Sequence, residues 1–288
     1  MLDLIEVKPK LNKKRVMFCL LLILFFVSFI AFWIVLGVKN HQEIKRVSEI
    51  CKTKENIKHV ITFTNPQIIV NDKVKEEIKN IYHSEQKRAF LTFDDGPSKQ
   101  VTPLLLDLLK QENIKASFFV LGSRVEFYPE IVKRAYEEGH FIGNHGYSHK
   151  YSQIYQSPQA VLDEYNMTEQ LVQNAIGNPS YQSHLMRLPG GTVGGKYNDL
   201  KAQAVTLLDQ NNICHVDWNA LTSDSAGSKT KEAMLESVKA TIGNKNSVVI
   251  LMHDAGDKIL TYEILPELIQ YLRDNGYQFM SFYDIMEE

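Results

Sequence analysis

The sequence predicts an α/β protein in which helices cover a parallel sheet, behind an N-terminal transmembrane helix. The sheet is either open and doubly wound or closed into a barrel. With 288 residues, 44% of them hydrophobic, the chain can form one large domain with its own core. From Arg88 onward, short apolar runs rich in strand-forming residues alternate with longer amphipathic stretches. Residues 16–38, in contrast, are apolar throughout and carry no charge.

The uncharged run at residues 16–38 predicts a membrane anchor, because a helix needs ~20 apolar residues to cross ~30 Å of hydrocarbon. A cleavable signal peptide is the alternative, but its apolar region spans ~7–15 residues and precedes a small-x-small site. Here the run ends in "LGVKN". Basic residues precede the run, which places residues 1–15 in the cytoplasm and the rest of the chain outside: Lys8, Lys10, Lys13, Lys14 and Arg15.

Residues 39–87 are polar and charge-rich and predict an extracytoplasmic stalk, with helical spacing in "KVKEEIKNIY". The net charge of −2 gives no basic patch for a nucleic acid, so we expect no nucleic-acid partner. Cys19 lies in the predicted anchor, and Cys51 and Cys214 are not spaced like a disulfide framework. Cys214 is therefore expected to be a small buried hydrophobic residue.

In residues 88–288, the alternation of apolar runs and amphipathic stretches predicts the position of each strand and helix. Strands are expected at residues 88–93, 116–122, 140–145, 184–189, 213–218, 247–253 and 277–282. Helices are expected at residues 101–113, 130–139, 158–176, 197–210, 230–243 and 262–276. Function in parallel α/β folds lies at the carboxyl ends of the strands. Polar residues follow five of these strands: Asp94 and Asp95, His145 and His149, Arg187, Asp217 and Trp218, and His253 and Asp254.

The stretch "LTFDDGP" ends the first of these strands with two adjacent carboxylates. Neighbouring anions raise each other's pKa and are costly to desolvate, so a positive charge is expected beside Asp94 and Asp95. An Asx-type turn is the structural alternative.

The stretch "GNHGYSHK" places two imidazoles four residues apart. On a helical turn, His145 and His149 would lie on one face and reach one ion. With Asp95 they form a two-histidine, one-carboxylate set that leaves positions open for water and substrate. Asp94 is then free to act as a base, and the cation removes the repulsion within the aspartate pair.

These motifs resemble those of the polysaccharide deacetylases of carbohydrate esterase family four, the NodB-homology domain. "TFDDGP", "GNHGYSH", "RLPGG" and "ILMH" occur in the family's order between residues 88 and 288. The resemblance implies a distorted barrel of seven β/α units. It also implies metal-dependent removal of an acetyl group from a polymeric sugar.

Position by position, the resemblance implies a role for each motif residue. Asp94 is the general base and Arg187 orients it, while His253 is the general acid that protonates the leaving amine. Three residues hold the metal, usually zinc: Asp95, His145 and His149. The backbone N–H of Gly190 donates to the oxyanion, Leu251 lines the acetyl pocket, and Trp218 either faces the substrate or plugs the barrel end.

Two positions depart from the family pattern. Gly146 replaces a Ser or Thr whose hydroxyl would brace the metal loop. In the fourth motif, the aspartate that tunes the acid histidine is absent where residues 221–225 align, and Asp217, Asp224 or Asp254 is expected to substitute.

We therefore expect an anchored, extracytoplasmic deacetylase that acts on an N-acetylated envelope polysaccharide, above all the N-acetylglucosamine of peptidoglycan. An anchor keeps the enzyme close to the envelope polymer. The alternatives are a non-catalytic carbohydrate-binding envelope protein of the same fold, or a deacetylase of a chitin oligomer, an exopolysaccharide or acetylxylan.

Overall fold

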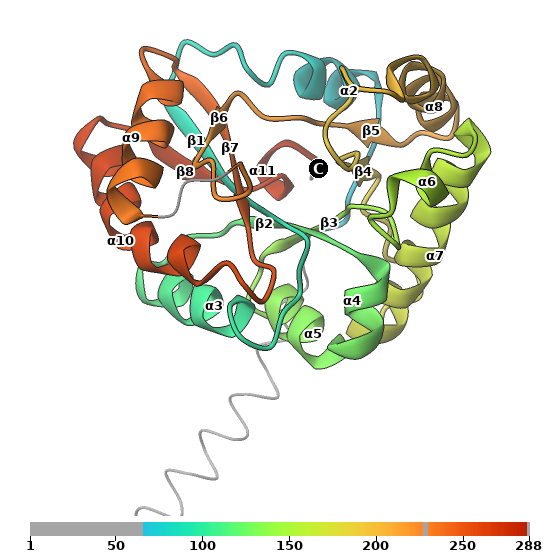
Figure 1. The fold of residues 1–288 in the computed structure, drawn as a ribbon, viewed down its shortest axis with the longest axis horizontal. Coiled ribbons are helices and arrows are strands. Elements are labelled where there is room, and N and C mark those ends of the chain that lie inside the picture. Colours follow the sequence, from blue (N-terminus) through green and yellow to red (C-terminus); the bar gives the residue numbers. More distant parts are fainter. Residues whose placement is uncertain (1–65, 227–229, 287–288) are drawn as a thin grey trace, which may run out of the picture. The chain divides into compact units, whose positions relative to one another are not determined.

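The fold is a half-barrel of parallel strands with helices on its outer face (Figure 1). The computed structural model describes residues 66–226 and 230–286. The strands follow the order β5-β4-β3-β2-β1-β7-β6, and β8 pairs with β1. The predicted class, parallel strands covered by helices, is confirmed. Among the described residues no ladder joins β5 to β6, so the barrel is open on one side instead of closed.

Of the eight strands among the described residues, seven coincide with predicted ones, and the eighth, β6, is a two-residue strand that the sequence pattern does not predict. Their bounds are β1 Arg88–Asp94, β2 Ser117–Val120, β3 Phe141–Asn144, β4 Leu185–Met186, β5 Cys214–His215, β6 Ala220–Leu221, β7 Ser247–His253 and β8 Gln278–Met280. Strand β1 lies beside β7 along its whole length; on its other side it pairs with β8 at residues 88–90 and with β2 at residues 92–94.

The described helices are α2 Asp72–Lys79, α3 Thr102–Gln111, α4 Gly122–Phe127, α5 Pro129–Glu137, α6 Tyr151–Ile154, α7 Pro158–Ile176, α8 Asn198–Gln210, α9 Lys231–Ile242, α10 Ile259–Asp274 and α11 Tyr283–Met286. Helix α7 has the bounds that the sequence predicts because both ends carry local signals. The Ser157 side chain caps the first turn, Pro158 follows it, and Gly177 ends the helix at φ 71°.

Alternation along β1 assigns its residues to two different layers. Ala89, Leu91 and Phe93 pack in the outer core, between the sheet and the helices. Phe90 packs in the inner core, inside the half-barrel. Because side chains alternate along a strand, Asp94 shares the inner face with Phe90 and is carried to the mouth of the barrel.

Helix α2 belongs to the same compact unit as the strands. Val74, Ile78 and Ile81 are buried in the inner core, so the packed unit extends N-terminally of the boundary expected at residue 88. The predicted cytoplasmic tail (1–15), anchor (16–38) and first part of the stalk (39–65) lie outside the described residues. Within the described part, no helix has the length and apolarity needed to cross a membrane.

Candidate active site

Asp95, His145 and His149 converge at the mouth of the half-barrel, with their candidate ligand atoms within 4.8 Å of one another. The Asp95 Oδ1 atom lies 3.5 Å from His145 Nε2 and 3.4 Å from His149 Nε2. The predicted helical turn is absent: both histidines lie on the loop after β3, in which His149 adopts φ 53°. Loop curvature, and not helical spacing, therefore turns the two rings toward one point.

These three side chains fit a cation. Asp95 Oδ1 is buried and has no hydrogen-bond partner among the described residues, which is costly unless a positive ligand is present. Burial lowers the pKa of His145 to about 3, so its imidazole is neutral. Its Nδ1–H donates to the Arg187 carbonyl at 2.7 Å, which leaves the Nε2 lone pair facing Asp95.

Asp94 is paired with a buried arginine. Arg187 is fully buried and donates from Nη1 to Asp94 Oδ1 at 2.8 Å and to Thr92 Oγ1 at 2.7 Å. Burial raises the pKa of the Asp94 carboxyl, and the Arg187 charge opposes that rise. Arg187 also donates to the backbone carbonyls of Val216 and Asp217. Arg187 thus holds the Oδ1 atom of Asp94, and the other carboxylate oxygen, Oδ2, lies 3.8 Å from His145 Nε2.

Asp224 is the carboxylate that tunes His253. Its Oδ1 lies 2.8 Å from His253 Nδ1, and its Oδ2 accepts from the His253 backbone N–H and the Thr261 hydroxyl. Burial alone would lower the pKa of His253, but the Asp224 hydrogen bond and the charges of Asp224, Asp94 and Asp95 raise it to about 9. His253 therefore carries its proton at neutral pH.

The other two candidates for this role serve elsewhere. Asp254 accepts from the Thr102 hydroxyl at 2.6 Å, and burial raises its pKa to about 7. Asp217 accepts from the backbone N–H and the hydroxyl of Thr192. The sequence could not decide among the three, because the deciding contact joins residues 29 positions apart, with helix α9 between them.

Glu164 of α7 was missed by the sequence analysis, and it braces the loop between the two histidines. Its carboxylate accepts from the backbone N–H of Tyr147 at 2.8 Å, and from the Ser148 N–H and hydroxyl at 2.9 and 2.7 Å. The hydroxyl expected at position 146 is thus not needed. A helix residue holds the loop that carries both candidate metal ligands.

The remaining predicted residues surround the same mouth. Leu251 is buried on β7, two residues before His253 and hence on the same face of the strand. Gly190 has φ 74°, and a Cβ there would lie 2.3 Å from the Tyr151 hydroxyl, so this close approach needs glycine. Trp218 is half-buried, with its ring 5.9 Å from the Arg187 guanidinium.

A cavity of about 310 Å³ lies directly over Asp95 and His149. Leu121 and Phe127 give it an apolar side, and the Phe127 side chain is 73% exposed. The metal-ligand set is therefore open to solvent on a face where a large molecule can approach.

Comparison with known proteins assigns this site to a family. The pattern of the family described as polysaccharide deacetylase matches residues 82–212. The solved structure of a Streptococcus mutans CE4 esterase is 32% identical, with a TM-score of 0.66 over 72% of this chain and 90% of that one. The chain belongs to the polysaccharide deacetylases of carbohydrate esterase family four. It is a hydrolase that acts on amide bonds.

Two curated relatives of this deacetylase carry peptidoglycan in their names. A peptidoglycan-N-acetylglucosamine deacetylase of Bacillus cereus is 29% identical over 257 residues, which cover 87% of this chain and 88% of that protein. The peptidoglycan-N-acetylglucosamine deacetylase PgdA of Listeria monocytogenes is 34% identical over 202 residues. That match covers 70% of this chain and 39% of the Listeria protein, which is longer.

Glu164→Ala is expected to weaken metal binding by about 10- to 100-fold, because the loop between the two histidines loses its brace. Competition between the apo-protein and a fluorescent zinc chelator measures this affinity directly. Asp163→Ala, on the neighbouring exposed position of the same helix, is the matched control and should leave the affinity unchanged. Equal affinities for both variants would show that the brace is unimportant.

Asp224→Asn is expected to lower the pKa of His253 from about 9, because the substitution removes the principal group that raises it. The general-acid role that the resemblance implies for His253 requires the protonated imidazole, so activity is expected to fall as the pH rises through this pKa. The alkaline limb of the kcat/KM profile should then move to lower pH in the variant. ¹H–¹⁵N NMR titration of the imidazole checks the shift independently, and an unmoved limb would contradict the assignment.

Proposed function

We propose that this deacetylase hydrolyses the acetamido group of an N-acetylated envelope polysaccharide, above all N-acetylglucosamine in peptidoglycan. The mouth of the half-barrel carries four groups that support this proposal. They are the candidate metal ligands, the Arg187-bound Asp94, the protonated His253 and the backbone amide of Gly190. The relatives named for peptidoglycan N-acetylglucosamine support this substrate.

Asp95, His145 and His149 would hold the cation, which we propose to be zinc. Zinc accepts two neutral imidazoles and one carboxylate and leaves a coordination position open. Such an ion supplies polarisation of the acetyl carbonyl and acidification of a water at neutral pH.

The chain's own residues then carry out the proton transfers. Asp94, held by Arg187, takes the proton from the attacking water, and the Gly190 amide donates to the developing oxyanion. Expulsion of the amine needs a proton, because an amide anion is a very poor leaving group. His253 can deliver it from Nε2, since Nδ1 is occupied by Asp224. Leu251 would line the acetyl pocket, and Trp218 would face the sugar.

Asp94→Asn is expected to reduce acetate release by about 10²- to 10⁴-fold, because the variant cannot accept the proton. The metal content, measured by mass spectrometry, should stay at the wild-type level, since Asp94 is not among the proposed ligands. Released acetate from peptidoglycan is the activity readout, with Asp163→Asn as the control. Full activity of rigorously metal-free protein, or of the Asp94 variant, would reject the mechanism.

We also propose that residues 16–38 anchor the enzyme in the cell membrane with the catalytic domain outside. The uncharged run and the basic residues before it support this topology. The full-length protein should sediment with membranes, and protease added to intact spheroplasts should cleave the catalytic domain. Recovery of the protein in the soluble cytoplasmic fraction would overturn the topology.

A further inference from the structure

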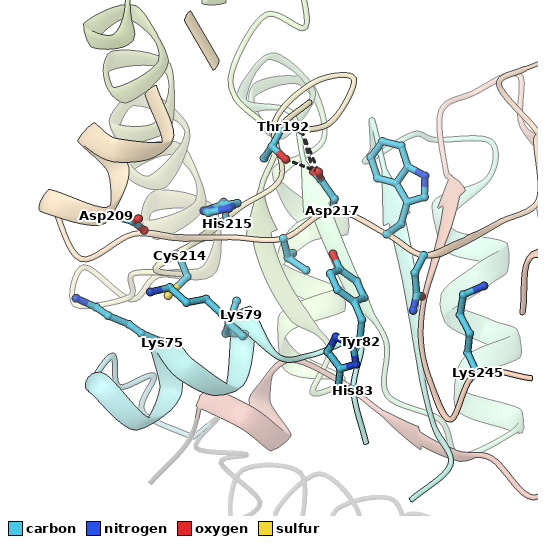
Figure 2. A pocket seen from close by; sticks show the side chains of 14 residues that line it. Lys75, Lys79, Tyr82, His83, Thr192, Asp209, Cys214, His215, Asp217 and Lys245 are labelled. Carbon is cyan, nitrogen blue, oxygen red and sulfur yellow. Dashed lines mark hydrogen bonds between the residues drawn. The ribbon is translucent and has the colours of Figure 1, made fainter. Parts of the chain in front are cut away.

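A second cavity, of about 900 Å³, lies on the open side of the half-barrel (Figure 2). Its walls are helix α2, strand β5 with the following residues 216–219, and Lys245 before β7. In a closed barrel, further backbone pairing would occupy the gap between the edges of β5 and β6. Here α2 covers part of that gap, and the cavity is what it leaves open. A cavity of this size suits a small molecule or a segment of a polymer.

Lysines line this cavity, and two of them, Lys75 and Lys245, already donate hydrogen bonds within the protein. Lys75, Lys79 and Lys245 line it, against the acids Asp209 and Asp217. The Asp217 carboxylate already accepts from the Thr192 amide and hydroxyl (Figure 2). Lys75 donates to the Asn212 side chain.

Within the described residues, the Lys79 ammonium has neither an ion pair nor a hydrogen bond. It is therefore available to an anionic ligand, which gains most from a charge that has no other partner.

Aromatic surface lies beside these cations. Tyr82 and Trp218 are both half-buried in the wall, and Ile78 and Val216 form an apolar floor. In Figure 2 the Tyr82 ring stands in the middle of the cavity between the lysines of α2 on one side and Lys245 on the other. Flat apolar faces together with ammonium groups suit a ring-shaped ligand that carries a carboxylate, such as an acidic sugar.

The cavity shares a wall with the catalytic centre. The carbonyls of Val216 and Asp217 accept from Arg187, which holds Asp94. Asp217 also fixes Thr192, two residues after Gly190. A sugar bound in the cavity would therefore lie directly behind the groups that orient the base and the oxyanion donor.

We propose that this cavity is a subsite for a carboxylate-bearing sugar of the substrate polymer, with Lys79 as its cation and Trp218 as its stacking face. The inference rests on the proposed function and deepens it. Peptidoglycan alternates N-acetylglucosamine with a lactyl-bearing sugar, N-acetylmuramic acid, whereas chitin has no carboxylate. The subsite gives the enzyme a means of choosing between the two polymers.

The test compares two disaccharides on the full-length chain carrying Asp94→Asn, in which turnover is slow enough for binding to be measured at equilibrium. The probes are N-acetylglucosaminyl-N-acetylmuramic acid and neutral di-N-acetylchitobiose. The chain has two tryptophans, and Trp33→Phe leaves Trp218 as the only fluorescent indole, so quenching reports on this cavity. Lys79→Gln is expected to raise the Kd of the acidic disaccharide about tenfold and to leave that of chitobiose unchanged.

Lys73→Gln is the matched control, because Lys73 is an exposed residue of the same helix that does not line the cavity. It should change neither Kd. Equal effects of the two lysine variants, equal effects on the two disaccharides, or unchanged Trp218 fluorescence would each overturn the subsite. Acetate release by the chain with Asp94 intact is measured separately, so a failure of the proposed function is distinguished from a failure of the subsite.

Discussion

The buried ion pair between Asp94 and Arg187 is the constraint on which the site depends. Arg187 is completely buried, and its guanidinium donates to the β1 residues Thr92 and Asp94 and to two backbone carbonyls after β5. Its carbonyl in turn accepts from His145. One side chain therefore connects Asp94, which is the proposed base, a metal-ligand candidate and the wall of the second cavity. Loss of either partner would leave an uncompensated charge in the interior, which is among the costliest defects in a fold.

Four carboxylates lie close together at this mouth, and they differ in their hydrogen-bond partners and in the direction of their pKa shifts. Asp94 is paired with a cation, and Asp95 Oδ1 has no partner among the described residues. Asp224 is hydrogen-bonded to an imidazole, and its pKa is lowered, whereas burial raises the pKa of Asp254 to about 7. Environments that push like groups apart in pKa are how one site assigns separate acid and base roles.

Periodicity and local chemistry made much of this structure predictable. The strands β1 and β7 are long apolar runs, and α7 has capping signals at both ends, so their positions follow from nearby residues. The rest depends on contacts between distant segments. Glu164 reaches its loop from another element, and Asp224 reaches His253 across 29 residues. The second half of the predicted stalk packs into the barrel through three apolar residues whose spacing shows a helix but not its partner.

An incomplete barrel leaves two strand edges without neighbours in the part of the chain that the structure describes, and such edges are ordinarily where separate molecules associate. In this protein both edge strands, β5 and β6, are only two residues long. A ladder that short offers a foreign strand too few amide and carbonyl groups to dock against. The fold can therefore keep an accessible flank for a ligand without inviting fibril-like association, a balance that lengthening either strand would disturb.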